Sequence, residues 1–196
     1  MNRPHLTRKD LMSLEQYSTA RQAFRAKVIE HKRKRSLALG PNATWSFEDQ
    51  LTMQYQVQEM LRVERIFEAE AIQEELDAYN PLIPDGGNWK ATLLLEFPDA
   101  DERRQRLAQL KGVEDRCWVQ VAGFDRVWAI ADEDLEREND EKTSSVHFLR
   151  FELSPQMCAQ AKAGFAVGAG IDHDNYRHAV TSLPHNVRES LVKDLA

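Results

Sequence analysis

Residues 170–178, Gly-Ile-Asp-His-Asp-Asn-Tyr-Arg-His, form the densest group of potential metal ligands in this 196-residue chain, which has only six histidines. Asp172, His173 and His178 stand out, because neutral imidazole and carboxylate oxygen together suit Fe(II), Zn(II) or Mn(II). Two histidines and one carboxylate can form the facial arrangement of a non-haem iron site. We expect the segment to be a loop that follows a strand. The alternative is a turn in which Asp172 and Asp174 accept hydrogen bonds from backbone amides.

Two more candidate ligands are polar residues set in apolar patterns. His147 alternates with Leu149 and Phe151, so it shares their face of a predicted strand. Glu64 falls on a heptad-like apolar stripe of a predicted helix, where burial raises the pKa of a carboxyl unless a cation or metal pairs with it. The alternatives are a packed, hydrogen-bonded histidine and an ion pair between Glu64 and an arginine. The metal hypothesis joins these two residues to the 170–178 cluster.

Hydrophobic periodicity predicts which elements hold these residues. A short helix opened by Thr7 and Asp10, a helix over 20–35, a small hairpin turned at 40–42 and a long helix from 49 to 79, bent near 70, make up a helical N-terminal third. Strands are expected at 90–97, 116–121, 126–131, 143–153 and 166–171, and helices at 99–110, from 154, and at 184–195. Residues 132–141 are expected to be an acidic loop or short helix.

Short connections between successive strands favour an antiparallel sheet. We therefore predict an α+β fold, in which a helical N-terminal third with a long helix packs on a largely antiparallel sheet with peripheral helices. One domain is expected to span residues 1–196, with a subdivision near 80–88 between a mainly helical part, 1–79, and a β-rich part, 89–196.

Charge is unevenly distributed along the chain, whose net charge is −6. Residues 1–40 carry ten lysines and arginines against three acids, and the remainder carries 16 against 29. The steepest basic run follows His31 at a predicted helix end, where cations meet the negative end of the helix dipole. It is a candidate surface for an acidic partner or an anionic cofactor, and pairing with the acidic body is the alternative. Its members are Lys32, Arg33, Lys34 and Arg35.

Several classes of protein are excluded or disfavoured by what the sequence lacks. Cys117 and Cys158 stand far apart and outside a CxxC spacing, which argues against a disulfide framework or a cysteine-based metal site and favours a reduced, cytoplasmic setting. No apolar run approaches the ~18 residues of a membrane span. The basic run has no interleaved aromatic residues and the chain is acidic, so nucleic-acid binding is disfavoured. Phosphate-loop and nucleophile-elbow motifs are absent.

Several strings of the chain, in order, resemble a bacterial family named as domain of unknown function 3501. They are HKRKRSLALGPNATWSFED (31–49), QEMLRVERIFEAE (58–70), LDAYNPLIPDG (76–86), EKTSSVHFLRFEL (141–153) and GIDHDNYRH (170–178). The family has no established activity, so the resemblance assigns no catalytic residue. Its members are often encoded beside rubrerythrin-like proteins and iron–sulfur oxidoreductases, which implies a role near iron, peroxide defence or electron transfer.

Two functions follow as hypotheses. The first is a cytoplasmic protein associated with iron or zinc and linked to redox or oxidative-stress metabolism, either as an enzyme or as an accessory to one. Its ion would be held by His173 and His178 with Asp172 or Glu64, and with His147 as a further ligand. The second is a non-catalytic protein that docks on an iron–sulfur oxidoreductase or a rubrerythrin-like protein through the basic helix. The sequence leaves homo-oligomer formation open.

Overall fold

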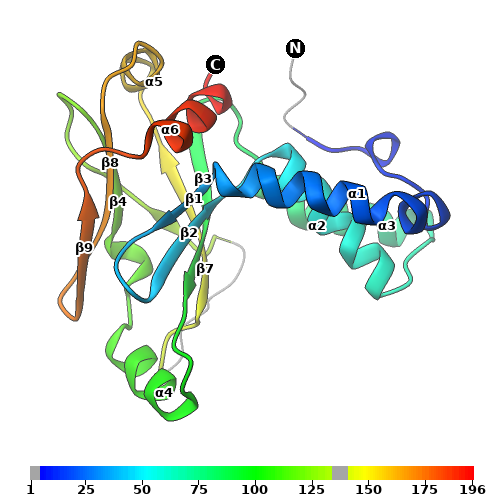
Figure 1. Ribbon diagram of the computed structural model, residues 1–196, viewed down its shortest axis with the longest axis horizontal. Helices are drawn as coiled ribbons and strands as arrows, with labels where there is room; N and C mark the ends of the chain where they lie inside the picture. Colours follow the sequence, from blue (N-terminus) through cyan, green and yellow to red (C-terminus); the bar gives the residue numbers. More distant parts are fainter. Residues whose placement is uncertain (1–4, 134–140) are drawn as a thin grey trace.

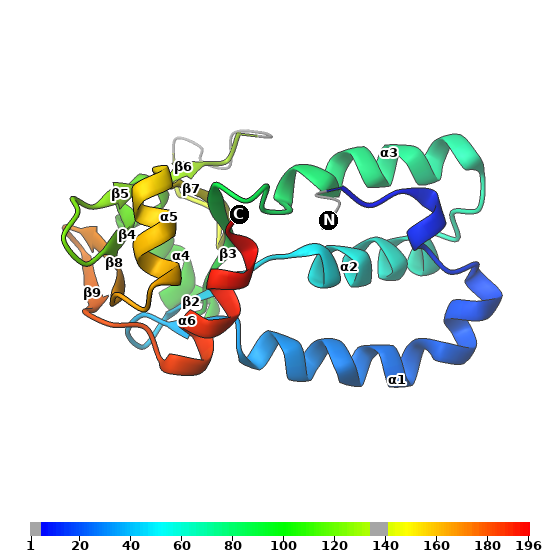
Figure 2. The same ribbon diagram turned by 90° about the horizontal axis from the view of Figure 1, so that it is seen from above.

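The computed structural model describes residues 5–133 and 141–196, and it has the predicted α+β architecture (Figure 1). A helical arm projects from a body of two antiparallel sheets. Figure 2 shows that the helices of the arm run side by side and that the C-terminal helix lies where arm and body meet. The arm consists of α1 (Leu14–Arg33), α2 (Gln50–Val63) and α3 (Ala69–Tyr79), with the short helices η1 (Arg8–Asp10) and η2 (Asn80–Leu82).

The body is built from two sheets in the described part of the chain. The first has the order β1-β2-β3-β7-β6, with β1 (Ser36–Ala38), β2 (Ala43–Phe47), β3 (Asn88–Leu95), β7 (Val146–Glu152) and β6 (Ile130–Ala131). The second has the order β5-β4-β8-β9, with β5 (Val127–Trp128), β4 (Cys117–Val121), β8 (Val167–His173) and β9 (Tyr176–Val180). The remaining helices are α4 (Ala100–Gln109), η3 (Glu114–Arg116), α5 (Pro155–Lys162), α6 (His185–Leu191) and η4 (Val192–Asp194).

Arm and body each have their own hydrophobic cluster. The cluster of the arm contains Met53, Val57 and Leu61 of α2, which recur at helical spacing and pack with Leu76 of α3. The larger cluster of the body is made by the inward faces of the two sheets, where buried and half-buried residues alternate along β2, β3 and β7. This alternation confirms the prediction that His147 faces the core, because its side chain is fully buried.

The predicted long helix from 49 to 79 is wrong in its middle, because α2 ends at Val63 and α3 begins at Ala69. Arg65 adopts a left-handed conformation with φ of 56°, which a continuing helix cannot contain. Phe67, which lies between the two helices, is 71% exposed. The helical spacing of apolar residues in the sequence therefore extends beyond Val63, although the helix itself ends there.

Two strands also differ from prediction. The segment 126–131 is not one strand, because the chain leaves β5 in the second sheet at Ala129 and enters β6 in the first. The segment 170–178 is not a loop but a hairpin, in which His173 pairs with Tyr176 and Ile171 with His178. Of the predicted acidic segment 132–141, residues 134–140 lie outside the described residues.

Buried Arg35 lies between the end of α1 in the arm and the start of β1 in the body. Its guanidinium donates hydrogen bonds to the carbonyls of Phe47 at 2.9 Å and Glu48 at 3.0 Å, and it forms an ion pair with Asp194 of the C-terminal segment at 2.5 Å. These bonds fix the C-terminus of the chain against the end of α1. No helix within residues 5–133 or 141–196 is both long and apolar enough to cross a membrane.

Candidate metal centre

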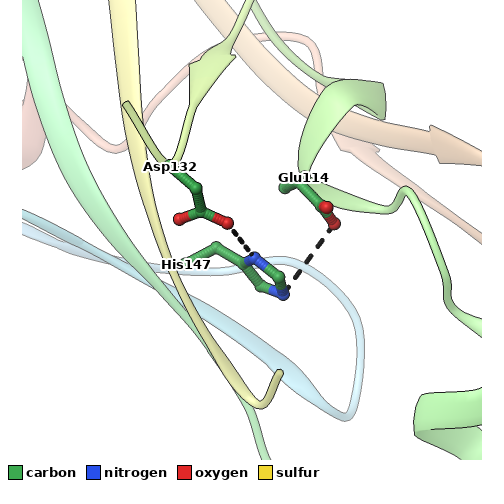
Figure 3. A group of neighbouring side chains, drawn as sticks. All are labelled: Glu114, Asp132 and His147. Atoms are coloured by element: carbon green, nitrogen blue, oxygen red, sulfur yellow. Dashed lines mark hydrogen bonds and ion pairs between the residues drawn. The ribbon is translucent and has the colours of Figure 1, made fainter. Parts of the chain in front are cut away.

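His147 lies at the centre of the one group of three or more potential metal ligands that residues 5–133 and 141–196 bring together. Its companions are Asp132, which follows β6, and Glu114 of η3, and their ligand atoms all lie within 4.8 Å of one another. Figure 3 shows one carboxylate at each nitrogen of the imidazole ring. Three elements distant in sequence therefore converge on one buried histidine.

The pairing of β6 with β7 positions Asp132. Its backbone amide donates to the Phe148 carbonyl at 2.9 Å, and its Oδ1 accepts from the Phe148 amide at 2.8 Å. These two bonds leave Oδ2 facing the histidine, 2.6 Å from His147 Nδ1. The edge of the first sheet thus holds the carboxylate in a fixed orientation against the ring.

The second nitrogen, His147 Nε2, faces a set of oxygen atoms. Glu114 Oε2 lies 3.8 Å away, and Thr143 Oγ1 and the Ser144 carbonyl oxygen each lie 3.0 Å away. A carbonyl only accepts hydrogen bonds, so Nε2 donates a proton to this group. Because Nδ1 meets a carboxylate, both ring nitrogens have acceptors.

This arrangement favours the charged form of the ring. Burial alone lowers the pKa of His147, but the hydrogen bond with Asp132 and the negative charges of Glu114 and Asp132 outweigh it, so the pKa is raised above 6.5. The ring therefore lies between two carboxyl groups that favour its protonated form. The hydrogen-bonded series Asp132–His147–Thr143 has the connectivity of a carboxylate–imidazole–hydroxyl relay. The protonated Nε2 cannot take a proton from Thr143, however, and the hydroxyl is buried.

The ligands predicted in the 170–178 cluster do not converge with His147, and among the described residues none of them belongs to a group of three potential ligands. In His173, Nε2 lies 3.0 Å from the Lys111 carbonyl oxygen, and Nδ1 accepts from the Asn175 amide at 3.2 Å, so both ring nitrogens serve the hairpin turn. The His178 ring packs against the Tyr176 ring in a tilted arrangement, with ring centroids 4.6 Å apart and an interplanar angle of 57°. Pairing across the strands of the hairpin separates the residues that a loop would have gathered.

Asp172 and Glu64 have other roles as well. Asp172 forms ion pairs with Arg126 at 3.1 Å and with Arg177 at 3.4 Å on the surface of the second sheet. Glu64 is the exposed C-terminal cap of α2, and its amide donates to the Met60 carbonyl at 2.9 Å. The expectation that Glu64 is buried on an apolar stripe is wrong, because the helix ends there.

The basic run is divided between core and surface. Arg35 is only 2% exposed and paired with Asp194, which corrects the expectation that it contributes to a partner-binding surface. His31 pairs with Asp49 at 2.6 Å, and Arg33 pairs with Glu30 on the surface of α1. Lys32 is partly exposed and Lys34 exposed. Pairing with the acidic part of the chain, the alternative to partner binding, accounts for His31 and Arg35.

Sequence reasoning missed Glu114 and Asp132. Neither has a neighbour in sequence that marks it as a ligand, because Glu114 lies in a turn of charged residues and Asp132 begins an acidic stretch. The one available signal was His147 itself, since a histidine on an apolar strand face requires buried polar partners. Their identity depends on how η3 and β6 pack against β7, which local patterns do not encode.

Comparisons with known proteins give a family but no activity. A family model whose description is "protein of unknown function (DUF3501)" matches residues 5–195. The chain is also similar to a crystal structure at 1.90 Å of a novel protein of unknown function from Burkholderia pseudomallei K96243, with a TM-score of 0.93 and 48% sequence identity over 98% of this chain and 100% of that chain. A search of curated proteins finds no match.

Proposed function

Because the chain belongs to the DUF3501 family, whose description names no activity, we propose its function from the geometry of its own side chains. We propose that it binds one divalent metal ion, iron or zinc, at the site formed by Glu114, Asp132 and His147. The observation that carries this proposal is the buried imidazole with a carboxylate at each nitrogen. Imidazole and carboxylate together are ligands that both ions accept.

The distances assign different parts to the two carboxylates. Two ligand atoms bound to one ion at ~2.1 Å are about 3 Å apart at a right angle and at most about 4.2 Å apart. The 2.6 Å between His147 Nδ1 and Asp132 is too short for an ion to lie between them, so it is a hydrogen bond. The 3.8 Å between His147 Nε2 and Glu114 falls within the range. The ion therefore belongs on the Nε2 side.

In this arrangement Asp132 orients the ring without binding the ion. A histidine that ligates a metal commonly donates its other N–H to a carboxylate, which fixes the ring and makes the ligating nitrogen more basic. Thr143 Oγ1 and the Ser144 carbonyl oxygen, each 3.0 Å from Nε2, are further candidate oxygen ligands on the metal side. The ion replaces the proton on Nε2, so its uptake releases a proton and weakens as the pH falls.

The identity of the ion decides how far the function extends. Iron, which changes its oxidation state, would support the role in redox or oxidative-stress metabolism that the family resemblance implies. Zinc has no redox chemistry of its own and would support a structural or hydrolytic centre instead.

Metal content of the protein, purified without a histidine tag, tests the proposal. We expect close to one equivalent of iron or zinc in the wild-type protein, and loss of metal in Glu114→Gln. Asp132→Asn should retain the ion with an affinity reduced by about 10- to 100-fold, because it removes only the orienting bond. Cobalt(II) added to metal-free protein gives an absorption spectrum that reports the ligands directly, and Glu114→Gln should change it.

His173→Gln and His178→Gln are the matched controls, because they remove histidines of the cluster that the sequence favoured. Both should leave metal content and the cobalt spectrum unchanged. Less than about 0.1 equivalent of metal after incubation with iron or zinc, in wild type and Glu114→Gln alike, would refute the proposal. Loss of metal in the two controls but not in Glu114→Gln would place the ion elsewhere.

A further inference from the structure

The outer face of the first sheet, opposite His147, borders a cavity of about 580 Å³ where the helical arm meets the body. Pockets of this size are typical of small-molecule sites. The helices contribute Met60, Tyr79 and Leu82, and the sheet contributes Ile130 and Phe148. The walls are thus largely apolar, and the charged side chains among them decide what they can bind.

Arg150 and Glu133 at the cavity neutralise each other. Glu133 accepts both hydrogen bonds of a fork from Arg150, at 2.7 Å each, and Arg150 also contacts Glu152. The Arg150–Glu133 pair is neutral by itself, and Arg150 has no positive charge left for a ligand because Glu152 pairs with it as well. Among the described residues that line the cavity, Lys90, the neighbour of Arg150 across β3 and β7, is the remaining cation.

Lys90 is a half-buried ammonium that forms no ion pair with any residue of the described chain. Its Nζ donates one hydrogen bond, to the Pro81 carbonyl, and an ammonium has three donors. Burial lowers its pKa in spite of the more distant negative charges of Asp85, Glu133 and Glu152. The charge of Lys90 is therefore held beside apolar walls at a cost that a bound anion would offset.

Glu75 of α3 also lines the cavity. Burial, followed by the nearby charges of Glu64 and Glu74, raises its pKa, so Glu75 gives up its proton less readily than an exposed glutamate. Asp77, also in the lining, is exposed and accepts a hydrogen bond from Gln73 at 2.8 Å.

We propose that this cavity binds a small carboxylate with an apolar body, whose carboxylate pairs with Lys90 and whose body packs between Phe148, Ile130 and the side chains of the arm. The site is separate from the metal centre and does not depend on it. It adjoins that centre, however, because the Phe148 amide donates to Asp132 Oδ1. A ligand against Phe148 would lie one residue from the histidine.

The proposal is tested by calorimetric titration of metal-free protein with three compounds of the same size. 3-Phenylpropionate carries the carboxylate, 3-phenylpropan-1-ol is its neutral counterpart, and 3-phenylpropylamine carries a positive charge. We expect the carboxylate to bind at least about tenfold more tightly than the alcohol, the gain from one hydrogen bond to a charged group. Lys90→Met should abolish this difference and Lys90→Arg should preserve it.

Lys162→Met, on the exposed side of α5, is the matched control and should bind like wild type. Ile130→Trp fills the cavity and should weaken the carboxylate and the alcohol together. Equal affinity for carboxylate and alcohol, tighter binding of the amine, absence of saturable binding, or an unchanged preference in Lys90→Met would each overturn the proposal. A thermal melt of every variant establishes that it is folded. Because these titrations use metal-free protein, a negative result for carboxylate binding would not depend on whether the His147 site binds a metal ion.

Discussion

Glu59 connects two helices of the arm, and its removal should destabilise the protein in a pH-dependent way. Its carboxylate accepts hydrogen bonds from Tyr17 at 2.6 Å and from Arg21 at 2.7 and 2.9 Å, which joins α2 to α1. The bond from Arg21 is the main cause that lowers the pKa of Glu59 from 4.5 to about 2, and the bonds from Tyr17 and Arg62 add to it against the opposing effect of burial.

The size of the effect follows from linkage. A shift from 4.5 to about 2 corresponds to about 3 kcal/mol of stability, and solvent screening at the partly exposed arginines reduces this to about 2 kcal/mol. Because the folded-state pKa is below the unfolded one, this contribution is fully present above pH ~5 and is lost as the pH falls toward 2. Glu59→Gln should therefore cost about 2 kcal/mol at pH 7 and clearly less at pH 3.5.

Urea denaturation of wild type and Glu59→Gln at pH 7, 4.5 and 3.5 measures this difference. Glu64→Gln is the control on the same helix, since Glu64 is exposed at the end of α2, and it should stay within about 0.5 kcal/mol of wild type. A difference between Glu59→Gln and wild type that is constant from pH 7 to 3.5 would refute the assignment of the stability to the ionised carboxylate. A difference below about 0.5 kcal/mol at pH 7 would refute the network itself.

Three further predictions concern the body and its junction with the arm. Arg35→Met should lower the free energy of unfolding by about 3–5 kcal/mol, because it leaves Asp194 without its buried cation, whereas Arg33→Met on the surface of α1 should change it by less than about 0.5 kcal/mol in the same urea experiment. Gly40→Ala should cost at least about 2 kcal/mol in a thermal melt, because φ at Gly40 is 77° and the new methyl would lie 2.5 Å from the His178 ring. Gly123→Ala is the control, because Gly123 has a similar φ of 89° but open space around it, and it should cost about 1 kcal/mol in the same thermal melt. Cys117 and Cys158 are buried and burial raises the pKa of both thiols, so a thiol reagent should modify them slowly in native protein and at once in urea; rapid labelling of native protein would contradict their burial.

Local patterns were sufficient wherever a few neighbouring residues determine an element. Ser154 and Pro155 mark the start of α5, where the serine side chain accepts from the Met157 amide. Thr7 and Asp10 form the predicted capping box of η1. The same holds for His147, whose buried side followed from alternation along one strand. In each case the deciding contacts lie within four residues of one another or on one strand face.

Patterns failed where distant contacts decide. Nothing in the sequence between Val63 and Ala69 is a proline or glycine, so the break at Arg65 had no local signal. The hairpin of β8 and β9 did have one, because Asp174 and Asn175 are turn residues flanked by β-prone stretches. Correct pairing would have shown that His173 and His178 lie on different strands.

The energetic cost of the His147 centre is itself an argument for a ligand. A buried ion pair or triad can often be replaced by apolar side chains without loss of stability, so such a group is weak support for a stabilising role. The inward face of β7 is already filled by Leu149 and Phe151, and a third apolar residue would extend that core. Natural proteins keep costly polar groups where function requires them. The triad of Glu114, Asp132 and His147 fits this pattern, since an ion bound at Nε2 would add a further favourable interaction for these buried polar groups.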